Sequence, residues 1–90
     1  MARKIPIISL EDFEAKAKKP LMMRTLVTKI ADGIEDNLES VNIAEIKHTD
    51  IILSVSKDEW KGGLEKAMEY YIENEQYEVC SRIKKLIKKL

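Results

Sequence analysis

Ninety residues are enough for a single domain with one small hydrophobic core. Apolar residues make up 44% and charged residues 36% of the chain, which favours a folded domain over a disordered segment. Sixteen basic and sixteen acidic residues leave no net charge, which excludes an overall attraction to nucleic acid or to a membrane surface.

The chain carries a single cysteine and no long apolar run. Cys80 has no partner for an intrachain disulfide, which favours a reducing compartment. The apolar run that begins at Ile5 ends before Glu11, too early for the apolar part of a secretory leader. No segment approaches the roughly 20 apolar residues that cross a bilayer. We therefore expect a cytoplasmic protein that makes no membrane contact.

The first expected element is a short helix over residues 9–18. Ser9 is placed to cap its N-terminus, and acidic residues follow in the first turn. Ile8 and Phe13 occupy the positions of a hydrophobic staple across that cap. The helix is expected to stop before Pro20, because the proline ring disfavours helical geometry in the preceding residue.

An apolar stripe predicts a second helix over residues 21–38. Its members repeat at the spacing of one helical face: Leu21, Met22, Leu26, Val27, Ile30, Ala31, Ile34 and Leu38. Gly33 lies within this helix, where glycine costs up to about 1 kcal/mol relative to alanine. We expect Gly33 to mark either a bend or a close contact.

The middle of the chain has the character of a β-hairpin. Residues 41–43 and 51–55 are rich in β-branched side chains and partly alternate, which predicts two strands. The polar residues 47–50 between them predict the turn. Because a lone hairpin is not stable in water, one apolar face is expected to pack on the helices.

A capping box predicts that a third helix begins after Ser56. The Ser56 hydroxyl is expected to accept a hydrogen bond from the amide of Glu59, whose carboxylate reaches back to the cap. Val55 and Trp60 flank this cap at staple positions. The apolar residues that follow repeat at helical spacing: Leu64, Ala67, Met68, Tyr71 and Ile72.

Residues 74–76 predict a tight break, after which a last helix begins. Its apolar side consists of Val79, Cys80, Ile83, Leu86, Ile87 and Leu90. The sequence thus predicts an α+β fold in a single domain, residues 1–90. Two N-terminal helices and a β-hairpin occupy residues 1–55, and a C-terminal antiparallel helical hairpin occupies residues 56–90.

The last helix opens with an aromatic and an acidic residue, followed by small, aliphatic and basic residues: Tyr77, Glu78, Cys80, Ser81, Ile83, Lys84 and Ile87. Through them, residues 64–90 resemble the UVR motif, a helical hairpin of bacterial excision-repair nuclease subunits and of some Clp-protease-associated proteins. The resemblance implies protein–protein contact in which one hairpin pairs with another. Lys85 departs from the motif, which usually has an acid there. The whole chain also looks like small accessory proteins of large tailed phages, by general likeness.

Like charges form rows on the two C-terminal helices. Glu65, Glu69 and Glu73 repeat every four residues, an arrangement in which they repel one another. The basic row lies in the last turns, where cations suit the helix dipole: Lys84, Lys85, Lys88 and Lys89. The two rows either face each other in an antiparallel hairpin or dimer, or are two separate solvated faces.

The residue types that carry catalysis are sparse. One histidine and one cysteine are too few for a structural zinc site, which needs four nitrogen or sulfur ligands. His48 is expected in an exposed turn, and Cys80 is expected to pack as a small apolar side chain. Gly62 and Gly63 lack the spacing of a phosphate-binding loop. We expect no enzymatic activity, no metal and no cofactor.

These patterns favour a protein-binding adaptor or regulator that acts through its C-terminal hairpin. A homodimer is expected, and a phage origin would make a host protein the target. The expected partner-binding residues are aromatic or aliphatic: Tyr70, Tyr77, Ile83, Leu86, Ile87 and Leu90. The alternative is a nucleic-acid-binding accessory protein whose lysine row contacts phosphates: Lys84, Lys85, Lys88 and Lys89.

Overall fold

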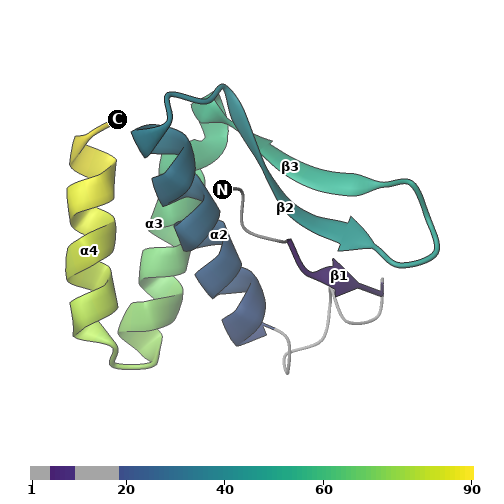
Figure 1. The fold of residues 1–90 in the computed structure, drawn as a ribbon. Helices are drawn as coiled ribbons and strands as arrows, with labels where there is room; N and C mark the ends of the chain where they lie inside the picture. Colours follow the sequence, from purple (N-terminus) through teal and green to yellow (C-terminus); the bar gives the residue numbers. More distant parts are fainter. Residues whose placement is uncertain (1–4, 10–18) are drawn as a thin grey trace.

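The computed structural model describes residues 5–9 and 19–90. The described elements follow the order β1 (Ile7–Ile8), α2 (Lys19–Glu35), β2 (Ser40–Ile46), β3 (Ile52–Ser56), α3 (Lys57–Glu73) and α4 (Tyr77–Lys88) (Figure 1). Residues 10–18, which carry nearly all of the predicted first helix and its staple residue Phe13, lie outside the described residues.

The expected order of two N-terminal helices followed by a β-hairpin is wrong. Among the described residues a strand comes first. β1 pairs in parallel with β2, which pairs antiparallel with β3, so this part of the chain forms a mixed sheet of three strands. The amides of Glu45 and Lys47 donate to the carbonyls of Pro6 and Ile8, at 2.9 and 2.6 Å. A strand of two residues has no periodicity to recognise, and its partner lies almost forty residues along the chain.

A β-bulge explains why β2 does not alternate. Asn42 lies opposite Ser54 and Ala44 lies opposite Leu53, so Ile43 is an extra residue in β2. An extra residue shifts the pleat by one position, which places neighbouring side chains on the same face. Four apolar residues of β2 are consequently buried: Val41, Ile43, Ala44 and Ile46.

α2 and α3 lie against the sheet, and α4 packs on these two helices away from the strands (Figure 1). The expected helix over 21–38 is present as α2, although it begins at Lys19 and ends at Glu35. Pro20 therefore lies in the first turn, where its missing N–H would have no helical partner in any case. The break over 74–76 is also present. Glu75 takes a left-handed φ of 57°, and the Gln76 amide donates to the Tyr71 carbonyl at 2.8 Å.

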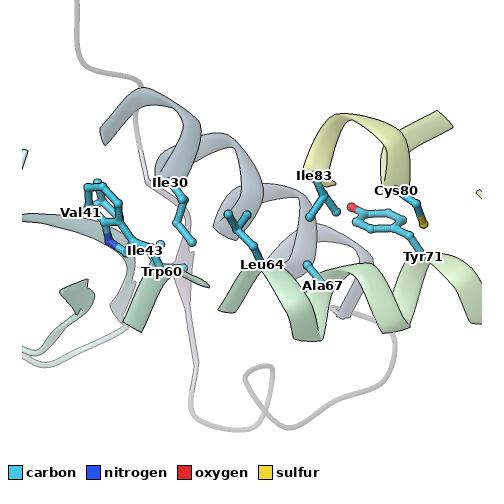
Figure 2. Packing of buried hydrophobic residues seen from close by; sticks show 9 residues of the cluster. All are labelled: Ile30, Val41, Ile43, Trp60, Leu64, Ala67, Tyr71, Cys80 and Ile83. Carbon is cyan, nitrogen blue, oxygen red and sulfur yellow. The ribbon is translucent and has the colours of Figure 1, made fainter. Parts of the chain in front are cut away.

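The main core joins the sheet to all three described helices (Figure 2). Trp60 is completely buried, and its indole Nε1 donates to the Val55 carbonyl at 2.9 Å. The buried residues of this main core are Ile30, Val41, Ile43, Trp60, Leu64, Ala67, Tyr71, Cys80 and Ile83.

The capping box at the start of α3 is confirmed in its position but not in its hydrogen bonds. The helix does begin after Ser56, but the Ser56 side chain makes no cap hydrogen bond to the backbone. Its hydroxyl instead donates to the Glu59 carboxylate at 2.9 Å. The two side chains of the box therefore bond to each other.

Candidate functional site

A groove lies between α2 and α4, which both pack against α3 but make few contacts with each other. It has a volume of about 580 Å³. Its lining comes from α2, the end of α3, the α3–α4 turn and α4: Arg24, Val27, Thr28, Ala31, Asp32, Glu35, Tyr71, Gln76, Val79, Arg82, Lys85, Leu86 and Lys89. We call this surface the α2–α4 groove.

Helical spacing places apolar and charged side chains together along the groove. On α2, Val27 and Ala31 are one turn apart, and Glu35 follows after another turn. On α4, Val79 and Leu86 are two turns apart, with basic residues at intervening and flanking positions. Each wall therefore has apolar side chains with charged side chains beside them.

Tyr71 contributes to the floor of the groove from α3. Its side chain is 7% exposed, and this burial is the main reason why the pKa of its phenol is raised above 10.0. The neighbouring Tyr70 raises that pKa as well, whereas Arg24 and Arg82 lower it. The two arginines come from opposite walls, so the phenol lies within the electrostatic influence of both.

The charged side chains that line the groove are mainly basic. Four are basic, namely Arg24, Arg82, Lys85 and Lys89, and two are acidic, namely Asp32 and Glu35. The balance of +2 contrasts with the zero net charge of the whole chain. Because both acids belong to α2, the α4 wall carries only basic charge, which favours an acidic ligand there.

The apolar residues expected to bind a partner are not all on the surface. Ile83 is 0% exposed and points from α4 into the core (Figure 2), where no partner reaches it. Leu86 and Ile87 are half-buried, and of the two only Leu86 lines the groove. Tyr77 and Leu90, near the two ends of α4, are 62% and 46% exposed.

Tyr70, one of the expected partner-binding residues, is half-buried. Its ring meets that of Tyr71 edge-on, with 5.1 Å between centroids. The Lys19 ammonium lies 5.5 Å from the Tyr70 centroid. Tyr70 supports the floor residue Tyr71 from the side and does not itself line the groove.

The lysine row divides into two pairs. Lys85 and Lys89 line the α2–α4 groove, whereas Lys84 and Lys88 are exposed and do not line it. The acidic row on α3, residues 65, 69 and 73, is also exposed and contributes nothing to the groove. The charge that matters at the groove is thus the Lys85–Lys89 pair with the two arginines.

Sequence reasoning did not identify the α2 side of the groove. Val27 and Ala31 were assigned to the predicted apolar stripe, yet both are only half-buried. The signal was the width of that stripe, which has eight members, of which only Ile30 is fully buried in the structure. A stripe wider than one neighbour covers indicates a second contact surface.

The remaining candidates for chemistry lie apart from the groove. His48 is exposed in the β2–β3 turn with a φ of 65°, and the buried Cys80 Sγ lies 3.7 Å from the Met68 carbonyl. Within residues 5–9 and 19–90, no cluster of three His, Cys, Asp or Glu side chains is placed to hold a metal ion. In the same ranges no helix has the length and apolar character needed to cross a membrane.

Comparison of the chain with family models, curated proteins and solved structures finds no match.

Proposed function

We propose that this protein is a non-enzymatic binding module whose α2–α4 groove receives an acidic amphipathic helix of a partner protein. The observation that carries the proposal is a groove with apolar side chains on both walls and only basic charge on its α4 wall. Peptide helices bind in such grooves by laying an apolar stripe on the floor and charged flanks against the rims.

The dimensions of the groove suit a helix of about three turns. From Arg24 to Glu35 the α2 wall advances eleven residues, which is roughly 16 Å at the helical rise of about 1.5 Å per residue. Apolar side chains spaced three and four residues apart on the ligand helix would lie over Val27, Ala31 and Leu86. Acidic residues beside that stripe would lie against Arg82 and Lys89.

The exposed apolar residues at the ends of α4 extend this surface. Tyr77 lies near the Gln76 end of the groove, and Leu90 follows Lys89 at the other end. Ile83 has no part in the proposal, because its side chain is buried in the core. The resemblance of residues 64–90 to UVR hairpins supports the same class of function, and the likeness to phage accessory proteins suggests a host protein as the partner.

The direct test uses a fluorescent helical peptide with a leucine stripe and glutamates along one flank as the probe. The double variant Lys85→Glu/Lys89→Glu reverses the basic wall, and we expect it to weaken binding at least tenfold. The matched control is Lys84→Glu/Lys88→Glu, which makes the same change of charge on the same helix outside the groove. The control is expected to change affinity less than threefold, because neither Lys84 nor Lys88 lines the groove.

Two results would overturn the proposal. One is an affinity of the wild type for the glutamate-flanked peptide no higher than for a scrambled peptide of the same composition. The other is an equal loss of binding in both double variants, which would indicate attraction by overall charge. Far-ultraviolet circular dichroism of each variant verifies that the fold is retained.

Nucleic acid is the alternative ligand, since all four lysines of the basic row are exposed and available for phosphate contacts. In that case both double variants lose binding to a labelled duplex alike, and affinity falls steeply as salt rises. A polyanion carries charge on every side and would meet the carboxylates of Asp32 and Glu35 on the α2 wall, whereas an amphipathic helix can turn its acidic flank to α4 alone. We therefore favour a protein helix.

A further inference from the structure

The two edges of the sheet differ in how they are protected. The β1 edge is two residues long, and Pro6 directly precedes it. The β3 edge is five residues long and reads Ile52-Leu53-Ser54-Val55-Ser56, with no charge and no proline. Short strands, prolines and charged side chains are the usual protection against edge pairing. Only the β1 edge has any of them.

The backbone groups that face outward on β3 follow from its hydrogen bonds to β2. The Ile51 carbonyl accepts from the Ile46 amide at 3.0 Å, and the Lys57 amide donates to the Glu39 carbonyl at 2.8 Å. Residues 51 and 57 therefore point their backbone groups at β2. Because these groups alternate along a strand, those of Ile52 and Ser54 point away from the sheet.

The side chains of this edge are also incompletely covered. Ile51 and Ile52 are 55% and 50% exposed, and Leu53 and Val55 are half-buried. Ile51, Leu53 and Val55 alternate with Ile52 and Ser54, so they share the sheet face that carries Ala44, the partner of Leu53. In Figure 1 the β2–β3 turn extends well beyond α3 and α4. These helices do not shield the end of the hairpin.

We infer that β3 pairs antiparallel with β3 of a second copy of the chain, with Leu53 on the two-fold axis. In this register Ile52 and Ser54 of each copy exchange backbone hydrogen bonds with Ser54 and Ile52 of the other. Leu53 packs on Leu53, and Ile51 packs on Val55. The strand is thus complementary to itself, as an interface with two-fold symmetry requires.

The C-terminal end of β3 selects this register over its neighbour. With Leu53 on the axis, the outermost packed pair is Ile51 with Val55. A register centred on Ser54 would instead place Ile51 opposite Lys57, which begins α3 and cannot continue the strand pairing. The contact surface is small, so we expect a weak dimer whose population rises with protein concentration.

Disulfide trapping tests both the dimer and its register. In the Leu53-centred pair the two Cα atoms of residue 53 lie close enough for a disulfide, whereas those of residue 54 are diagonal neighbours. Under mild oxidation, Leu53→Cys is expected to form a covalent dimer at least ten times faster than Ser54→Cys. Ser81→Cys, exposed on α4, provides the rate of random collision. The wild type controls for the buried Cys80.

Sedimentation of the uncrosslinked protein provides an independent test. Ser54→Pro removes an outward N–H in each copy, while Ser54→Ala keeps it. We expect the dimer of the proline variant to have a dissociation constant about tenfold higher than that of the alanine variant, because two hydrogen bonds across the dimer are lost. The proposal fails if Leu53→Cys crosslinks no faster than Ser81→Cys, or if the wild type sediments as a monomer throughout. The proposal also fails if Lys85→Glu/Lys89→Glu abolishes the dimer and Ser54→Pro does not, because the contact would then lie at the α2–α4 groove.

Discussion

Gly33 on α2 and Trp60 on α3 are in contact at a distance that only glycine permits. A Cβ atom at position 33 would lie 2.7 Å from the Trp60 Cη2 atom and 2.7 Å from the Val41 Cγ1 atom. Both neighbours are buried, and Trp60 is completely so. Of the two roles expected for Gly33, a bend or a close contact, the structure shows the close contact.

Gly33→Ala is expected to destabilise the protein by about 1–3 kcal/mol, because the added methyl group overpacks the core. The gain of roughly 1 kcal/mol in helix propensity offsets only part of this cost. Urea unfolding followed by the fluorescence of Trp60, the only tryptophan, measures the change. An unchanged free energy of unfolding would mean that α2 and the indole separate easily.

Gly62→Ala is the matched change in the neighbouring helix and is expected to have the opposite sign. Nothing lies within 4 Å of a Cβ atom at position 62, and the residue is exposed within α3. Alanine should therefore stabilise the protein by about 0.4–1 kcal/mol through helix propensity and reduced entropy of the unfolded chain. The same urea titration applies. A loss of stability would show that the first turns of α3 must bend at this glycine.

Ionisation of Tyr71 is expected to destabilise the fold at high pH. Its pKa is raised above 10.0 in the folded state, mainly by burial, so the folded state favours the neutral phenol. The stabilisation is complete below pH 10 and is lost as pH rises through the folded-state pKa. Between neutral and strongly alkaline pH, Tyr71→Phe should therefore lose less stability than the wild type. Parallel losses in the two proteins would contradict this view of the groove floor.

Ser56→Ala is expected to cost less than the loss of an ordinary helix cap. A Ser or Thr cap that bonds to the backbone is worth about 1 kcal/mol. Because the Ser56 hydroxyl bonds to the exposed Glu59 carboxylate instead, we expect a loss of only about 0.5 kcal/mol or less. Thermal unfolding at low and high salt measures it. A full 1 kcal/mol would indicate that Ser56 caps the backbone in solution.

Two isoleucines on the C-terminal hairpin should respond very differently to truncation. Ile83→Ala is expected to cost about 2–5 kcal/mol, because the side chain is 0% exposed and leaves a cavity. Ile72→Ala should change stability by no more than about 0.5 kcal/mol, because 49% of that residue is exposed. Denaturation curves of the two variants test this directly. Similar losses of stability in both variants would mean that α3 and α4 are rotated about their axes relative to the structure, so that other side chains face each other.

These two isoleucines also show where sequence reasoning reached its limit. The sequence pattern places Ile72 on the apolar stripe of α3 and Ile83 among the expected partner-binding residues, whereas in the structure Ile72 is exposed and Ile83 is buried. Periodicity identifies the apolar side of a helix. Which edge of that side faces the neighbour depends on the rotation and crossing of two helices, and sequence spacing does not specify these.

Local signals predicted the described elements from α2 to α4, whereas β1 and the distant pairings were missed. The start of α3 after Ser56, the turn between β2 and β3, and the break before Tyr77 all follow from nearby residues. The α2–α4 groove brings Arg24 together with Arg82, which lie more than fifty residues apart in the sequence. No local pattern reports such a distance, so only the α4 half of the candidate site could be predicted.

The parallel pairing of β1 has a practical consequence for shortened forms of the protein. Ile8 is 3% exposed and packs with Ala44 and Ile46 in a second, smaller apolar cluster. A fragment that begins at Lys19 would expose those side chains and leave the amides of Glu45 and Lys47 without their acceptors Pro6 and Ile8. Such a fragment would expose both edges of its sheet, at β2 and at β3, and would aggregate through them. Shortened versions for crystallisation or spectroscopy therefore need to retain residues 5–8.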